Sequence, residues 1–237
     1  MAIDFSIVRE AIPVLLEGLR VTALVSLAGI PIGIVIGIAA AYAAQSRTLL
    51  RPIALGYVEL VRNIPYLILV YLSFFGLPKV GVSASAMTVA VGCTAFYTGG
   101  YFCEILRAAL RSVARGQTHA ALSLGMTYWQ TQRHIIAPQL FGFLIPPTTS
   151  LVIMMFKDSA IFSVMSLPEM TYQSNLLTAN TFAYVEVLGT TALIYWLSSV
   201  LLAGVGRRLE TVVGRRTRTP DAVAFSTLPA KGKGQLS

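Results

Sequence analysis

The sequence predicts an all-α membrane protein with five transmembrane helices. Hydrophobic residues make up 55% of the 237 residues and charged residues only 12%, whereas a soluble domain carries about 25% charged residues. Its apolar runs provide the roughly 20 residues that a helix needs to cross the hydrocarbon core of a bilayer. The spans are expected at about 19–44, 53–75, 84–106, 138–156 and 182–205.

The distribution of positive charge predicts how these spans are oriented. The formal net charge is +8, but most of the positive charge lies in short loops and the tail, so we expect no nucleic-acid partner. Thirteen Lys and Arg residues fall in 45–52, 107–137 and the tail from 207, and only Arg9, Arg20 and Lys79 lie on the opposite side. The positive-inside bias then predicts an outside amino terminus and an inside carboxyl terminus.

The amino-terminal part predicts a surface helix followed by a tightly packed span. Residues 1–18 are expected to form an amphipathic, interfacial helix, because apolar residues recur there at helical spacing; a frayed terminus is the alternative. In the first span, Gly29, Gly33 and Gly37 lie four residues apart on one face. Small residues at this spacing predict a close-packed seam with another helix.

The second and third spans contain charges that need partners. Glu59 and Arg62 are three residues apart in the second span and can pair on one helical face. Charges within a membrane usually face a bundle interior or a water-filled path. Glu104, near the end of the third span, can pair with Arg107 one turn later.

The fourth span is expected to be broken. Pro146 and Pro147 lie in its middle and remove backbone donors. Lys157 and Asp158 follow at its far end. Residues 160–181 are expected to form a short helix or a re-entrant element before the fifth span, and the basic tail 207–237 is expected to be disordered.

One stretch between the third and fourth spans, residues 115–138, cannot cross a bilayer. It is helix-compatible from about 117 to 132, carries the small residues Ala120, Ala121 and Gly125, and ends at Pro138. The predicted orientation makes it cytoplasmic. A short helix in this position is suited to contact a partner protein; an amphipathic helix resting on lipid is the alternative.

The same stretch resembles a known motif. Arg-Gly-Gln-x-x-Ala-Ala-x-x-Leu-Gly-Met-x-x-Trp-Gln, followed by Ile-Ile-x-Pro-Gln, spans 115–139 and is similar to the coupling-helix motif of bacterial ABC importer permeases, in the branch that imports polar amino acids. Arg62-Asn-Ile-Pro65, Lys157-Asp-Ser159 and Leu167-Pro-Glu-Met-Thr-Tyr172 also match, so the resemblance extends to about Glu210. Two positions depart from the motif: His119 replaces its Glu, and Ala137 replaces its Leu.

The resemblance implies a type I ABC importer permease of the bacterial inner membrane, a transport subunit and not an enzyme. The expected partners are a dimer of ATP-binding ABC subunits, a second permease copy or sister permease, an external solute-binding protein, a polar amino acid and membrane lipid. The chain contains no phosphate-binding loop of the Gly-x-x-x-x-Gly-Lys-Ser/Thr type, so ATP and Mg are expected on the partner. The residues expected to couple to the ATPase are Gly116, His119, Ala120, Ala121, Leu124, Gly125, Tyr128 and Trp129.

Four charged residues are candidates for the substrate path. An amino acid carries a carboxylate and an ammonium, which Arg62 or Lys157 and Glu59 or Asp158 could meet. Structural ion pairs are an equal alternative for the same residues. The rival functions are a secondary transporter or channel that works without ATP, and a membrane enzyme. We expect no catalytic residues and no metal site, because the two His and scattered carboxylates form no cluster.

Overall fold

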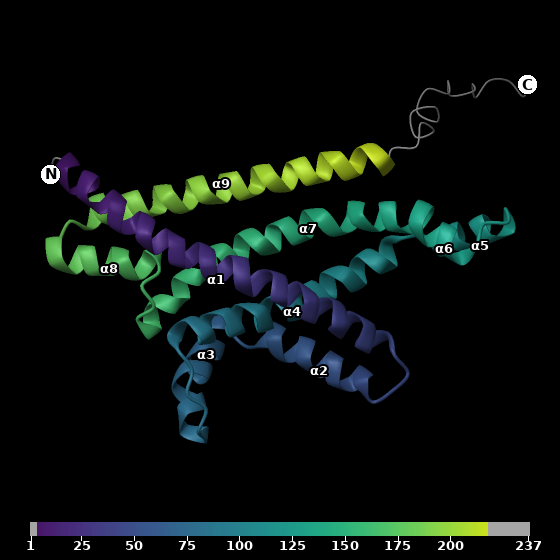
Figure 1. The fold of residues 1–237 in the computed structure, drawn as a ribbon, viewed down its shortest axis with the longest axis horizontal. Coiled ribbons are helices and arrows are strands. Elements are labelled where there is room, and N and C mark those ends of the chain that lie inside the picture. The colour runs from purple at the N-terminus through teal and green to yellow at the C-terminus, as the bar shows by residue number, and fades with distance from the viewer. Residues whose placement is uncertain (1–3, 218–237) are drawn as a thin grey trace, which may run out of the picture.

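The computed structural model describes the backbone of residues 4–217, with the side chains of all of them except 115 and 214–217. Within that range every regular element is a helix (Figure 1). The α-helices are α1 (Phe5–Gln45), α2 (Leu50–Asn63), α3 (Tyr66–Tyr71), α4 (Ala86–Ser112), α5 (Arg115–Ser123), α6 (Tyr128–Thr131), α7 (Ala137–Asp158), α8 (Met170–Thr181) and α9 (Tyr184–Thr217). Short π- or 3₁₀-helical pieces are η1 (Leu72–Gly76), η2 (Leu77–Val80), η3 (Gln132–Ile136) and η4 (Ser159–Met165).

Four helical stretches of the described chain are long and apolar enough to cross a membrane. They are Phe5–Gln45, Ala86–Ser112, Tyr128–Met165 and Tyr184–Val213, and the bent pair Leu50–Asn63 and Tyr66–Val80 makes a fifth if it is counted as one span. The expectation of several membrane spans is therefore confirmed, with four candidate spans by length and composition and a fifth candidate in two pieces.

The centre of the bundle is the contact between α1 and α4. A Cβ atom added to Gly29 would lie 2.7 Å from Cβ of Thr94, and one added to Gly33 would lie 2.5 Å from Cβ of Thr98. Side chains at these positions would force the two helices apart, since real Cβ atoms do not approach so closely. The small-residue seam predicted from the spacing of the glycines is confirmed, and its partner is α4.

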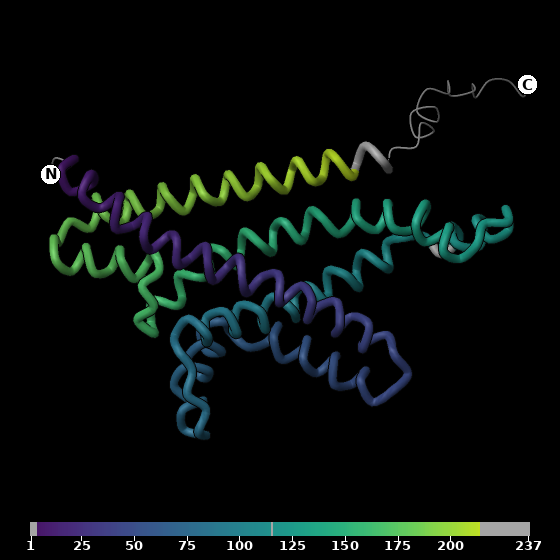
Figure 2. The backbone as a smooth tube through the Cα atoms, viewed as in Figure 1, coloured from purple at the N-terminus to yellow at the C-terminus, as the bar shows by residue number. Residues whose placement is uncertain are grey.

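The amino-terminal residues do not form a separate interfacial helix. From Phe5 onward they are the first part of the 41-residue helix α1 (Figure 2). Leu15 is fully buried in a small cluster with Ala11 and Met170 of α8. Phe5, Ile12 and Leu16 stay exposed. The correction is that the described part of 1–18 is the start of the first candidate span and not a separate surface helix.

The second span is broken in two. The helix axis turns by 108° between α2 and the α3–η1–η2 segment, which leaves the bundle as an arm (Figure 1). Ile64 adopts an extended conformation, as is favoured for a residue before proline because the ring of Pro65 clashes with an α-helical predecessor. The expectation of one continuous helix over 53–75 was therefore wrong, because the Ile64-Pro65 pair interrupts it.

The fourth span is not broken by its two prolines. α7 continues from Ala137 to Asp158 with Pro146 and Pro147 inside it. Hydroxyl groups of the three residues after the prolines donate to carbonyls one turn earlier: Thr148 to Leu144, Thr149 to Ile145 and Ser150 to Pro146. Such side-chain bonds help membrane helices to tolerate proline, so the expected break was wrong.

The carboxyl-terminal part of the described chain is more ordered than expected. Residues 160–181 contain most of η4 and all of α8, which packs beside α1. α9 then runs to Thr217, so the expected disorder is wrong for 207–217. The rest of the predicted tail, 218–237, lies outside the described residues.

Candidate coupling segment and translocation path

The segment between α4 and α7 lies beyond one end of the bundle (Figure 1). It is not the single helix expected over 117–132, because α5 ends at Ser123 and α6 begins at Tyr128. The amide of Met126 donates to the carbonyl of Ala121, and the amide of Gly125 donates to that of Leu122. This pair of bonds is a Schellman cap, which requires a left-handed residue; Gly125 supplies it with φ of +82°.

A second cap starts α6 directly after the turn. The hydroxyl of Thr127 accepts from the amide of Gln130, and the side chain of Gln130 accepts from the amide of Thr127. This reciprocal capping box fixes where the helix begins. The sequence Gly125-Met-Thr-Tyr-Trp-Gln130 therefore encodes a stop, a turn and a start.

The turn presents large apolar side chains to the outside. Leu124, Tyr128 and Trp129 are 83%, 65% and 72% exposed. Of the eight residues expected to contact the ATPase, seven are exposed and Ala121 alone is buried, at 2% exposure. Ala121 therefore belongs to the packing of α5 within this chain, whereas the other seven are available to a partner.

Arg62 does not pair with Glu59. Its guanidinium lies 3.7 Å from the carboxylate of Glu104 on α4, and the same carboxylate binds Arg107 and lies 4.0 Å from Arg111. Glu59 instead accepts from the side-chain amide of Asn63 at 3.1 Å. The predicted Glu104–Arg107 pair is confirmed, and the predicted Glu59–Arg62 pair is replaced by a link between α2 and α4.

Asp158 ends α7 and directly precedes η4, which carries Phe162. The ring of Tyr66 of α3 packs at a tilt against Tyr97 of α4, with ring centroids 4.5 Å apart, and lies edge-on to Phe162 of η4, with centroids 6.0 Å apart. The Asp158 side chain is half-buried, whereas that of Lys157 is exposed. Asp158 is therefore the less exposed of these two candidates for the substrate path. No ion pair of the described residues joins either one to Arg62 or Glu59.

Glu169 is a buried carboxylate to which the sequence analysis gave no role. It is fully buried in the turn between η4 and α8, outside the spanning helices, and accepts from the amides of Thr171 and Tyr172 at 2.9 and 2.6 Å. The Tyr195 hydroxyl donates to it at 3.3 Å. Burial raises the pKa of Glu169 to about 7, although these hydrogen bonds oppose the shift. The signal in the sequence was an acidic residue just after Leu167-Pro168, at a helix start.

Comparison with known proteins identifies the family. Residues 29–219 match the family of the binding-protein-dependent transport system inner membrane component, and the chain belongs to it. It is therefore a multi-pass protein of the inner membrane.

Individual relatives align over most of their length. The chain is 35% identical to "Probable amino-acid ABC transporter permease protein YckA" of Bacillus subtilis, over 79% of this chain and 83% of the relative. It is 32% identical to "Glutamine transport system permease protein GlnP" of Escherichia coli, over 89% and 97%. The solved structure described as "Crystal structure of an amino acid ABC transporter with histidines" matches with a TM-score of 0.81 at 30% identity, over 89% of this chain and 99% of that one. The methionine transporter MetNI, at 20% identity and a TM-score of 0.68, shares the fold.

Proposed function

We propose that this chain is the membrane-spanning subunit of an ATP-driven importer that receives polar amino acids from an external solute-binding protein. Membership of the family and the amino-acid transporters among its relatives support this proposal. ATP and Mg would be held by a separate dimer of ATP-binding subunits, because the sequence has no phosphate-binding loop. A second copy of this chain, or a sister permease, would complete the membrane part.

The observation that carries the coupling role is the capped turn at Gly125. Two short helices meet there at an angle fixed by the Schellman cap and the capping box, and the exposed Leu124, Tyr128 and Trp129 surround it. Aromatic side chains held on a rigid backbone are suitable anchors in a protein interface. A lipid-facing helix would need no such turn, so docking into the ATPase is the better account.

The proposed mechanism uses the connection of this segment to both neighbouring spans. α5 follows α4 after two residues, and α6 runs through η3 into α7. When ATP binding brings the two ATPase subunits together, the docked segments would move with them and carry α4 and α7 as rigid bodies. The Glu104 cluster would pass the motion of α4 to α2, because Arg62 binds it from the broken second span.

For the substrate path we propose the surroundings of Asp158. An ammonium group would find there a half-buried carboxylate, directly before the η4 segment whose Phe162 packs on Tyr66. Arg62, bound to Glu104, has a structural role in this proposal, and so does Glu59. The proposed orientation, with the amino terminus outside and the carboxyl terminus inside, rests on the distribution of Lys and Arg.

The discriminating experiment is reconstitution in liposomes. The chain together with its ATP-binding subunit and solute-binding protein should take up a radiolabelled polar amino acid only when ATP is present on the ATPase side. Uptake by this chain alone, driven by an ion gradient, would show a secondary transporter instead.

A further inference from the structure

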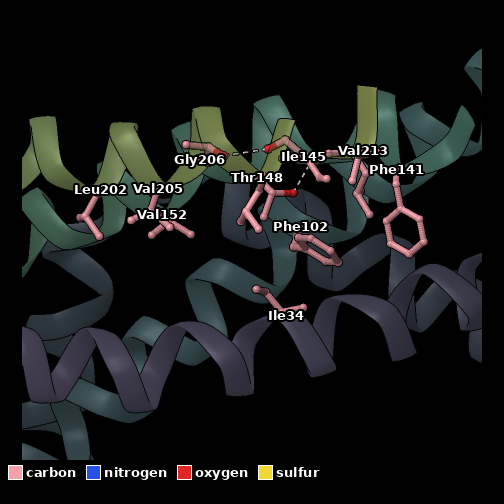
Figure 3. Close-up of a pocket in the computed structure, with 13 residues that line it drawn as sticks. Ile34, Phe102, Phe141, Ile145, Thr148, Val152, Leu202, Val205, Gly206 and Val213 are labelled. Carbon is pink, nitrogen blue, oxygen red and sulfur yellow. Dashed lines mark hydrogen bonds between the residues drawn. The ribbon is translucent and has the colours of Figure 1, made fainter. Parts of the chain in front are cut away.

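Two cavities of the described chain differ in the side chains that line them. One, of about 600 Å³, lies between α7, α9 and the α1–α4 pair (Figure 3), and the described residues that line it include no charged side chain. The other has a volume of about 310 Å³ and is here named the arginine pocket; it is lined by Gln45, Arg107, Leu110, Arg111 and Val113. Of these two cavities, the arginine pocket is the one that offers partners to a charged ligand.

The arginine pocket lies where α1 and α4 both end. Gln45 is the last residue of α1, and Val113 directly follows the last residue of α4. Both helices are candidate membrane spans, and both end on the side of the bundle from which α5 and α6 project (Figure 1). The pocket is therefore at one surface of the membrane. With the orientation proposed above, this is the cytoplasmic surface.

The length of α4 places the pocket at the level of the lipid headgroups. Its 27 residues extend over about 40 Å, which equals a hydrocarbon core of about 30 Å with a headgroup layer of about 5 Å on each side. Arg111 is one residue before the end of α4, and Arg107 lies about 8 Å before that end. Both guanidinium groups can reach the headgroup layer, because a long arginine side chain lies along apolar surface and brings its charge to the interface.

The charges around the pocket are not balanced. Three arginines surround one carboxylate: Arg62, Arg107 and Arg111 lie within 4.0 Å of Glu104, which itself does not line the pocket. Arg111, at 4.0 Å, is beyond hydrogen-bonding distance of Glu104, and no side-chain hydrogen bond found among the described residues uses it. A guanidinium carries five N–H donors, so the two arginines of the pocket keep both charge and donors for an anion.

We propose that the arginine pocket binds a phosphate group, with Arg107 and Arg111 as donors. The planar guanidinium matches phosphate because it can donate two parallel N–H bonds to it. The side-chain amide of Gln45 donates to the carbonyl of Ala41 at 3.2 Å and has a second N–H for the ligand. At headgroup depth the source of the phosphate is an anionic phospholipid, since basic pockets between membrane helices attract such headgroups.

A bound phosphate would join the ends of α1 and α4 and offset the excess positive charge beside Glu104. α5 begins two residues after α4, so the lipid would hold the two spans together next to the segment proposed to contact the ATPase. The proposal needs only a chain within a membrane and does not depend on which solute is transported.

Photo-crosslinking of lipid to the full-length chain in nanodiscs tests the proposal. The probe is phosphatidylglycerol with a diazirine on its headgroup, diluted in phosphatidylcholine, and labelled peptides are mapped by mass spectrometry. Peptides that contain Gln45 or Leu110 should be labelled, and Arg111→Gln should reduce this labelling about fivefold. The matched control is Arg208→Gln, which removes the same charge from an exposed residue of α9 outside the pocket lining; it should leave the labelling unchanged.

A second variant tests the pocket without altering the Glu104 cluster. Gln45→Glu changes an exposed side chain and places a carboxylate beside the proposed phosphate. Because like charges repel, it should reduce the labelling about fivefold or more, as Arg111→Gln does.

Two further arms separate the sources of phosphate. A phosphatidylcholine probe with the same diazirine should label the pocket about fivefold less than the phosphatidylglycerol probe. Inorganic phosphate, added at constant ionic strength, should not compete; competition would support the phosphate site and show that it also takes phosphate from solution. Equal labelling in Arg111→Gln and Arg208→Gln, no preference between the two lipids, or loss of labelling when the ATP-binding subunit is added would overturn the proposal.

Discussion

The capped turn at Gly125 allows a sharp test of the coupling role. Gly125 and Gly116 both lie in the segment between α4 and α7, and a Cβ atom added to either would meet nothing within 4 Å. They differ in backbone conformation, since Gly125 has φ of +82° whereas Gly116 is in helix α5. Any difference between Gly125→Ala and Gly116→Ala is therefore due to the backbone conformation at the two positions and not to steric clashes of the added methyl group.

The size of the effect follows from this difference. An L-residue in the left-handed region costs about 1–2 kcal/mol relative to glycine, which lowers the equilibrium constant for forming the capped turn about 5- to 30-fold. Alanine at position 116 instead stabilises helix α5 by about 0.5–1 kcal/mol. Gly125→Asn should fall between wild type and Gly125→Ala, because asparagine tolerates this conformation better than alanine.

The assay has two readouts on the same preparations. The affinity of the detergent-solubilised chain for its ATP-binding subunit should weaken in Gly125→Ala, by at most about 5- to 30-fold, and ATP-driven uptake in proteoliposomes should fall with it. Gly116→Ala should retain both. If Gly125→Ala binds and transports like the wild type, the turn is not the docking element and the coupling role assigned to it is wrong.

Three other predictions concern carboxylates. Glu104→Gln removes the partner of three arginines and should lower the free energy of unfolding by about 2 kcal/mol, which lowers the melting temperature by about 4–8 °C. The control, Glu59→Gln, should change the melting temperature little. Equal shifts in the two variants would contradict a special role for the Glu104 cluster. Asp158→Asn should reduce uptake about tenfold or more without weakening the binding of the ATPase. Lys157→Gln should leave uptake unchanged. Normal uptake in Asp158→Asn would show that Asp158 has a structural role and not a role in the substrate path. Burial raises the pKa of Glu169 from 4.5 to about 7, so between these pH values the folded chain holds a proton that the unfolded chain releases. The stability that comes from protonated Glu169 is therefore complete below about pH 4.5 and is lost as the pH rises through 7. Melting temperatures between pH 5 and 8 should show this fall in the wild type and a flatter profile in Glu169→Gln.

Local patterns predicted the features that depend on short stretches of chain. The spacing of Gly29, Gly33 and Gly37 was enough to predict a packing seam, since one face of a helix without side chains can only serve close approach. Glu104 and Arg107 were paired correctly because they are one turn apart. Hydropathy located the spans for the same reason, as it averages over a window no longer than one helix.

Features that depend on the whole fold were missed. Arg62 is three residues from Glu59, yet its partner Glu104 lies 42 positions along the chain, and only the packing of α2 on α4 brings them together. The burial of Glu169 likewise depends on α9, which supplies Tyr195. The turn at Gly125 was different, because its signals were present: a glycine followed by a Thr-x-x-Gln capping box predicts a stop and a new start.

The glycine seam between α1 and α4 also defines a fixed reference within a moving protein. Neither helix can slide or rotate past the other without driving Thr94 or Thr98 into the opposing backbone. Distances between spectroscopic labels placed on these two helices should stay constant throughout a transport cycle. Labels on α3 or on α7, each measured from that pair, would then record the motion of those helices relative to the α1–α4 pair.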